Sequence, residues 1–253
     1  QIDYLVLTHT DTDHIGDLEE VAKRFKIKEI CVSQGALTKP SFAKRLRFLK
    51  RPVRTLKAGD KLPMMGSNLQ VLYPNKIGDG GNNDSLVLYG KLLGTSFLFT
   101  GDLEKEGEEE LMSSYPNLKV SVLKAGHHGS KGSSSEAFLD QLEPSLALVS
   151  AGENNRYKHP NDETLERFKE RHISFFIQIR NQTQYSEIPD RISRRKQDPH
   201  LVFRRIRNKF IILPIIGKCV LRPAGLHRSI CRRFMTAGIF RKGNLSYRSY
   251  PCP

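Results

Sequence analysis

The chain has 253 residues, which is enough for one sizeable domain, or for one domain with an appendage. Its formal net charge of +14 is unevenly distributed, because residues 181–253 hold 16 Lys and Arg residues against 3 acidic ones, whereas residues 1–180 hold 25 against 24. The first part is therefore nearly neutral, which excludes a uniformly basic nucleic-acid-binding domain. The longest apolar stretch, residues 210–216, is far shorter than the roughly 20 residues that span a bilayer.

Strands and helices are expected to alternate up to residue 178, which is typical of an α/β domain. The chain begins at Gln1, inside a strand-like run, so we expect it to be a fragment of a longer protein. The expected strands are residues 3–8, 29–32, 69–73, 85–89, 95–100, 120–124 and 146–150. The expected helices are residues 15–25, 41–50, 104–113, 134–142 and 162–171. The strands at 85–89 and 95–100 are expected to form a hairpin.

Residues 179–253 differ in character, since they show no sustained period and are repeatedly interrupted by Pro. Their apolar content is too high for a typical disordered tail. We therefore divide the chain into a folded domain at residues 1–178 and an irregular basic tail at residues 179–253. The tail is either an appendage, partly ordered or disordered, or sequence not selected to fold, including sequence translated in a shifted frame. The four Cys residues are too widely spaced for a close-pair zinc site, and we expect free thiols.

The motif HTDTDH places four metal-ligand side chains, His9, Asp11, Asp13 and His14, at the junction of a strand and a helix. Alternate side chains of an extended segment share a face, so His9, Asp11 and Asp13 can converge. The turn into the helix then brings His14 beside Asp13. Imidazole and carboxylate groups are the ligands of hydrolytic metal sites. The alternative is a polar loop in which Asp13 caps the helix, but capping accounts for one residue of the four.

Two further segments carry ligand candidates at the ends of expected strands. Asp102 follows an apolar strand and precedes a helix, so its carboxylate projects from the end of a sheet. Taken alone, Asp102 is typical of a helix cap, but beside the first motif we interpret it as a ligand. The adjacent His127 and His128 lie between Gly residues, in an open loop that can supply a ligand, a proton donor and backbone N–H groups for a phosphate.

Two weaker candidates complete the set. His159 also follows a strand, in the segment NNRYKHP, and is a possible ligand. Asn83 and Ser85 open a hairpin strand, where they either contact substrate or serve ordinary turn chemistry.

The motifs HxDxDH, NND-S, TGDLE, GHHGSKGSSS and ENNRYKHP follow one another over residues 1–172. This order resembles the metallo-β-lactamase-like domain of the ComEC family of competence DNA-uptake proteins. The resemblance implies a four-layer αββα sandwich, here incomplete at its N-terminus and truncated at both ends. It also implies a two-metal phosphodiesterase centre. The metal ligands that the resemblance implies are His9, Asp11, Asp13, His14, Asp102 and His159. His127 or His128 would be a further ligand or the acid that protonates the leaving group. The residues implied to line the site or take part in catalysis are Asp13, His128, Asn83 and Ser85.

The function expected is hydrolysis of DNA during competence-related uptake, with two divalent metal ions assisting attack of hydroxide on phosphorus. Many relatives of this fold carry His where this chain has Asp11, and a carboxylate there favours Mn²⁺ over Zn²⁺, with Mg²⁺ also possible. Single-stranded DNA is the expected substrate, and the membrane channel portion of a full-length uptake protein is the expected partner, at the extracytoplasmic face of a bacterial membrane. Two alternatives stay open: a hydrolase of small phosphoesters or lactones, and an inactive truncated remnant.

Overall fold

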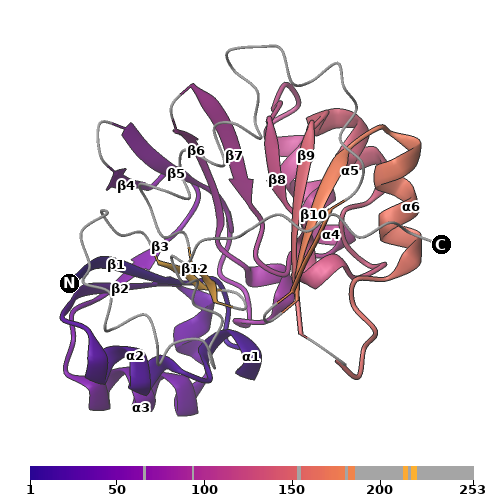
Figure 1. Cartoon of the computed structure of the whole chain (residues 1–253). Helices are drawn as coiled ribbons and strands as arrows, with labels where there is room; N and C mark the ends of the chain where they lie inside the picture. The colour runs from indigo at the N-terminus through magenta and orange to yellow at the C-terminus, as the bar shows by residue number, and fades with distance from the viewer. Residues whose placement is uncertain are drawn as a thin grey trace.

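The structure, a computed structural model, describes residues 1–64, 67–92, 94–152, 155–179, 182–185, 213–215 and 218–220. Its main features are two β-sheets, with helices on the outer face of each (Figure 1). Within the described residues, no helix combines the length and the apolar character needed to cross a bilayer.

The first sheet has five strands in the order β12-β13-β1-β2-β3. Its strands are β1 (Ile2–Leu7), β2 (Ile27–Ser33), β3 (Val53–Leu56), β12 (Leu213–Ile215) and β13 (Lys218–Val220). Strands β1, β2 and β3 are parallel. On the side of β1 away from β2, β13 pairs with it antiparallel, with Leu5 opposite Val220.

The second sheet has eight strands in the order β11-β10-β9-β8-β7-β6-β5-β4. Its strands are β4 (Lys61–Met64), β5 (Ser67–Tyr73), β6 (Val87–Leu92), β7 (Thr95–Phe99), β8 (Val122–Lys124), β9 (Leu146–Ala151), β10 (Ser174–Ile179) and β11 (Gln182–Tyr185). Strands β6 and β7 form the expected hairpin, with Leu92 opposite Thr95. Strands β7, β8, β9 and β10 are parallel, so their carboxyl ends meet at one edge of the sheet.

Six helices cover the two sheets. Those on the first sheet are α1 (Thr12–Ile15), α2 (Leu18–Arg24) and α3 (Pro40–Leu49), and those on the second are α4 (Lys105–Ser114), α5 (Glu136–Leu142) and α6 (Asp162–Glu170). Three short 3₁₀ segments, η1 (Gly35–Thr38), η2 (Asn82–Asp84) and η3 (Gly126–Gly129), lie in connections.

Alternation of buried side chains along the strands produces the layers. In β1, Leu5 and Leu7 pack against the helices of the first sheet, whereas Val6 packs between the sheets. In β7, Phe97 joins Val6 in the layer between the sheets, and Leu98 packs against the helices of the second sheet. Since a strand presents successive side chains to opposite faces, each strand contributes to two cores. The expected four-layer αββα sandwich is thus confirmed.

The expected elements are largely confirmed, with shifts of a few residues at their ends. The helix expected over 15–25 is confirmed only over residues 18–24, because α1 ends at Ile15 and α2 begins at Leu18, after the N-cap residue Asp17. Strands β3, β4 and β10 were not expected. Both β3 and β4 have only four residues, and β4 contains Pro63. Part of the tail expected to be irregular forms β11, β12 and β13, and residues 186–212 and 221–253 lie outside the described residues.

Candidate metal centre

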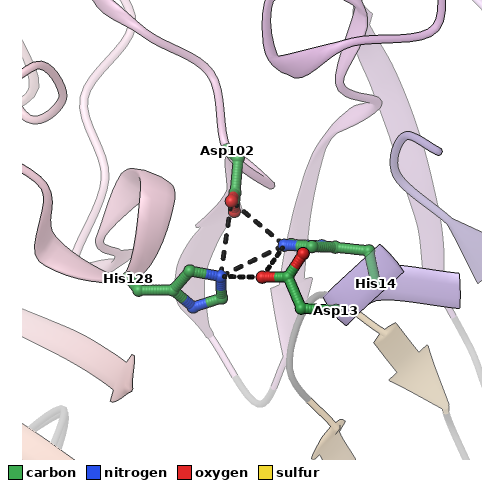
Figure 2. A group of neighbouring side chains, drawn as sticks. All are labelled: Asp13, His14, Asp102 and His128. Atoms are coloured by element: carbon green, nitrogen blue, oxygen red, sulfur yellow. Dashed lines mark hydrogen bonds and ion pairs between the residues drawn. The ribbon is translucent and has the colours of Figure 1, made fainter. Parts of the chain in front are cut away.

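Four ligand-type side chains from three separate segments meet at one point. Asp13 and His14 come from α1, Asp102 follows β7, and His128 lies in η3 after β8. Figure 2 shows the four side chains pointing toward one another. The Oδ2 atom of Asp102 lies 3.0 Å from Nε2 of His14 and 3.3 Å from Nε2 of His128. The Oδ2 atom of Asp13 lies 3.2 Å from Nε2 of His128, and ligand atoms of all four residues lie within 4.8 Å of one another.

The local backbone orients these four side chains toward the centre, and the neighbouring Asp11 is not engaged in capping a helix. Helix α1 begins after Asp11, and the Asp11 side chain forms no capping hydrogen bond. In η3, His127 and His128 have φ angles of 41° and 55°, the left-handed region that non-glycine residues rarely adopt. Such conformations cost of order 1 kcal/mol each and cluster at functional sites, where the surrounding structure holds them.

The chemistry of the donor set fits a divalent metal ion. The Nε2 atoms of His14 and His128 are 3.1 Å apart and both face the same oxygen of Asp102. Imidazole nitrogens and carboxylate oxygens converging on one point are the donors that hydrolytic metal sites use. In the described part of the chain, Oδ1 of Asp102 and Nε2 of His9 are buried and have no hydrogen-bond partner. Buried polar atoms without partners are costly, and a cation at this position would satisfy them.

The electrostatics of the four residues also favour a cation. At Asp102 burial opposes ionisation, but hydrogen bonds with His128 and His14 outweigh it and hold the pKa of the carboxyl well below its usual range. The hydrogen bond with His128 likewise lowers the pKa of Asp13. At His128 burial disfavours the charge, yet the hydrogen bonds to Asp102 and Asp13 raise its pKa to about 9. The two carboxylates are therefore ionised at neutral pH and attract positive charge, and a bound metal ion would replace the proton on His128.

His9 lies directly beside this cluster. Its ring centroid is 4.0 Å from that of His14, and burial lowers the pKa of His9 to about 3. Its Nδ1 atom lies 3.3 Å from Oγ of Ser85, while Nε2 lies 3.9 Å from the half-exposed carboxylate of Asp11. Ser85 Oγ also accepts a hydrogen bond of 3.1 Å from the backbone N–H of Asp102. His9 is therefore neutral. When its Nδ1–H donates to Ser85 or to Oγ1 of Thr8, which lies 3.1 Å away, Nε2 is left to bind a metal.

Two further histidines, His127 and His159, lie outside the group of four, at what we call the rim of the centre. His127 Nδ1 lies 3.1 Å from a carboxylate oxygen of Glu104, and its Nε2 lies 3.8 Å from Oδ2 of Asp102. The ring of His159 packs edge-on against that of His127, with centroids 5.4 Å apart, and Tyr157 stacks on His159. Neither His127 nor His159 belongs to the group of four.

Comparison with known proteins identifies the family. Residues 1–153 match the model of the metallo-beta-lactamase superfamily. The chain belongs to the metallo-beta-lactamase superfamily. Membership supports a metal-dependent hydrolase, in agreement with the donor set described above.

The relatives of this metallo-beta-lactamase domain include competence proteins. ComE operon protein 3 of Bacillus subtilis is 44% identical over 170 residues, which are 66% of this chain and 22% of that protein. Competence protein ComA of Neisseria gonorrhoeae is 34% identical over 67% of this chain and 23% of its own length. Recombination protein 2 of Haemophilus influenzae is 30% identical over 66% of this chain and 20% of its own length. The resemblance to the ComEC family is confirmed, and the chain spans about a fifth of the length of these relatives.

The metallo-beta-lactamase domain places the expected site residues in three groups. Asp13, His14, Asp102 and His128 form the cluster, and His9, Asp11 and Ser85 adjoin it. His127 and His159 lie on the rim. The exposed Asn83 faces α4 instead, where its Oδ1 accepts the backbone N–H of Glu104, so its expected role in lining the site stays a prediction.

Sequence reasoning missed three residues of the metallo-beta-lactamase domain that hold the histidines or their loop. Glu104 orients His127, and the backbone carbonyl of Ser150 lies 2.8 Å from Nδ1 of His128. The buried carboxylate of Glu108 accepts the backbone N–H groups of Ser134 and Ser135, in the loop that follows η3. Glu104 directly follows TGDL, so its place beside a proposed ligand was a usable signal, whereas no local pattern marks Glu108 or Ser150.

Proposed function

We propose that this domain is a metal-dependent phosphodiesterase that hydrolyses DNA during competence-related uptake. The observation that carries the proposal is the convergence of Asp13, His14, Asp102 and His128 on one point, next to a second pair of buried donor atoms without partners. Phosphodiester hydrolysis calls for positive charge close to the phosphate oxygens, and such a cluster of ionised and neutral donors can hold that charge.

Two divalent ions are proposed, held by overlapping ligand sets. Asp13, His14, His128 and Oδ2 of Asp102 would hold the first. Nε2 of His9, the carboxylate of Asp11 and Oδ1 of Asp102 would hold the second, because two of these three atoms are buried without partners in the described structure. Asp102 would then bridge the two ions. His159, expected as a ligand, stays a candidate, because its Nδ1 atom is also buried without a hydrogen-bond partner in the described structure.

When bound, the ions would supply a hydroxide nucleophile at neutral pH and neutralise phosphate charge. The chain's own residues would orient the substrate. Glu104 holds the His127 ring so that Nε2 faces the centre, where it can contact a phosphate oxygen or the leaving group. The exposed cations Lys131, Arg156 and Lys158 lie within three residues of His128 or His159 in the chain, and they would contact neighbouring phosphates.

The substrate proposed is single-stranded DNA, rather than a small phosphoester or a lactone. The names of two relatives, ComE operon protein 3 and Competence protein ComA, support a role in competence. On the same ground, we propose that the domain works at the extracytoplasmic face of a bacterial membrane, beside the channel portion of a full-length uptake protein. Mn²⁺ is the ion proposed, since Asp11 adds a hard carboxylate ligand to the second site.

The test compares metal content and cleavage in three proteins: wild type, Asp102→Ala and, as a control, Asp162→Ala. Asp162 is an exposed residue of α6. After Mn²⁺ loading and removal of free ion, elemental analysis should find about two ions in wild type and control, and fewer in Asp102→Ala. Wild type and control should also cut single-stranded DNA at low salt. Little bound metal in a folded wild type would contradict the proposal and favour an inactive remnant. Bound metal with cleavage of small esters but not of DNA would favour the small-substrate alternative.

A further inference from the structure

One face of helix α3 combines positive charge with an exposed aromatic ring. Phe42 and Leu46 of this helix are buried in the core under the first sheet. The opposite side carries Lys44, Arg47 and Phe48, all exposed, and the Phe48 side chain is 83% exposed. Lys44 and Phe48 are four residues apart, and Lys44 and Arg47 three, so the three side chains are neighbours on the helix surface.

Two more cations continue this surface at the end of the helix. Lys50, the C-terminal cap of α3, has a φ of 51°, and the chain then turns into Arg51. Both residues are exposed. We call Lys44, Arg47, Phe48, Lys50 and Arg51 the α3 face.

The four cations of the α3 face are not neutralised by neighbouring acids. In the part of the chain that the structure describes, Lys44, Arg47, Lys50 and Arg51 form no ion pair and no side-chain hydrogen bond. Arg45, on the inner side of the same helix, is the contrasting case. It pairs with Glu19 at 2.6 Å and donates to the backbone oxygen of Ile15 at 3.0 Å.

The same Arg45 contact connects α3 to the metal centre. Ile15 is the last residue of α1, next to His14, and Arg45 therefore ties α3 to the helix that supplies two of the four clustered ligands. Figure 1 shows α1, α2 and α3 together beneath the first sheet.

We propose that the α3 face binds single-stranded DNA outside the metal centre, with a base stacked on Phe48 and phosphates on the surrounding Lys and Arg side chains. Sequence-independent binding of single strands combines these two elements, cations that follow the backbone and an aromatic ring that accepts any base. A strand held there would raise the local concentration of substrate at the site. This inference rests on the proposed function for the choice of DNA as polymer.

An anionic membrane is the other polyanion that such a face could meet, and the structure favours it less. Helices that lie in a membrane interface insert a broad apolar face. The apolar face of α3, with Phe42 and Leu46, is buried in the protein core, and Phe48 is a single ring among cations.

The test measures binding of a fluorescent single-stranded oligonucleotide to the full chain in EDTA, so that no cleavage occurs. The variants are Phe48→Ala, Phe48→Tyr and the pair Lys44→Glu/Arg47→Glu. The controls are Ile77→Ala, at another exposed apolar residue, and Lys61→Glu, at an exposed cation of β4. Phe48→Ala should weaken binding about fivefold or more, and Phe48→Tyr should restore it. The charge pair should weaken binding and reduce the slope of log Kd against log salt by about 1.4.

An abasic oligonucleotide of the same length distinguishes binding at the α3 face from general electrostatic attraction to the basic residues 181–253. Loss of Phe48 should leave its affinity unchanged, since it offers phosphates but no bases to stack. Equal affinity of Phe48→Ala and wild type for the normal oligonucleotide would overturn the proposal. So would binding to phosphatidylserine vesicles that depends on Phe48 while oligonucleotide binding does not.

Failure of DNA binding at the α3 face can also be distinguished from failure of the proposed hydrolytic function. Hydrolysis of bis(p-nitrophenyl) phosphate with Mn²⁺ needs the metal centre and a small substrate, so the α3 variants should retain it. Asp102→Ala should lose it and keep oligonucleotide binding. Binding that depends on Phe48 in a protein without hydrolytic activity would support the α3 face while the proposed function failed.

Discussion

Replacing Glu108 by Ala should destabilise the domain strongly, although Glu108 touches none of the clustered ligands. The Glu108 carboxylate is fully buried. One oxygen accepts the N–H of Ser134 at 2.5 Å, and the other accepts the N–H of Ser135 at 2.9 Å. From the other side, Arg167 donates to the carbonyl oxygens of Ser133 and Ser134 at 3.0 and 3.1 Å. The loop after η3 is thus held between a carboxylate and a guanidinium group.

The magnitude follows from the groups that the substitution leaves behind. The buried N–H group of Ser134 and the partly buried one of Ser135 lose their acceptor, at about 1–3 kcal/mol for a buried group and less for a partly buried one. Ser134 has a φ of 53°, so the loop also loses the bond that holds a left-handed residue in place. Removing a buried ionised group returns part of this free energy, because burial disfavours the charge on Glu108. The free energy of unfolding should therefore fall by about 2–4 kcal/mol, a large part of the 5–15 kcal/mol typical of a domain.

Urea unfolding of Glu108→Ala and Glu109→Ala provides the assay. Glu109 is the next residue of α4, exposed and 4.0 Å from Lys105, and its removal should change the free energy of unfolding by less than about 0.5 kcal/mol. An equally small change in Glu108→Ala would refute the reasoning, since the two N–H groups would then have found other acceptors.

Three further predictions concern the pH dependence of stability, the backbone conformation at Gly101 and the metal preference. Burial raises the pKa of Glu108 above its ordinary 4.5, so the folded state binds the proton more tightly than the unfolded chain. The resulting stabilisation is fully present below about pH 4.5 and is lost as the pH rises through the folded-state pKa. The free energy of unfolding of wild type relative to that of Glu108→Gln should therefore fall as the pH rises above about 4.5. Gly101→Ala should lower both the stability of the domain and its metal content, because Gly101 has a φ of 57° and a Cβ there would lie 2.9 Å from Ser85 and 3.0 Å from Thr8. Thermal unfolding would measure the loss of stability, and elemental analysis the loss of metal. Wild-type values in both measurements would contradict this prediction. Metal-stripped protein should regain more DNA cleavage with Mn²⁺ than with Zn²⁺, and the reverse order would refute the argument from Asp11.

The sequence predicted the cluster best where the ligands are close together in the chain. His9, Asp11, Asp13 and His14 lie within six residues, so the turn from strand to helix brings them together whatever the rest of the fold does. Asp102 could be added because it follows an apolar strand, and the carboxyl ends of parallel strands share an edge. The strand–helix alternation indicated an α/β domain, whereas the four layers were expected only from the resemblance to the ComEC family.

The sequence could not decide which of several histidines reaches the centre. His127 and His128 are adjacent, and their left-handed backbone angles, which no residue pattern announces, turn His128 inward and leave His127 at the rim. Glu108 was missed for a similar reason. It lies 26 residues from Ser134 in the chain, and an acidic helix start reads as solvated until the partner loop is placed on it. Short strands such as β3 lack the length to show a period.

The residues that orient the histidines explain why their Nε2 atoms face the centre. The Nδ1 atom of His128 lies 2.8 Å from the carbonyl oxygen of Ser150, and the Nδ1 atom of His9 lies 3.3 Å from Ser85. In both rings one nitrogen is occupied, which fixes the ring and leaves the other to bind a metal. Ser85 also holds Asp102, because its Oγ accepts the backbone N–H of that residue. One carboxylate oxygen of Asp102 lies near His14 and His128, and the other has no partner in the described structure. Ser85, which was expected either to serve turn chemistry or to line the site, thus joins the two halves of the centre, and its hydroxyl contacts a ligand of each proposed ion.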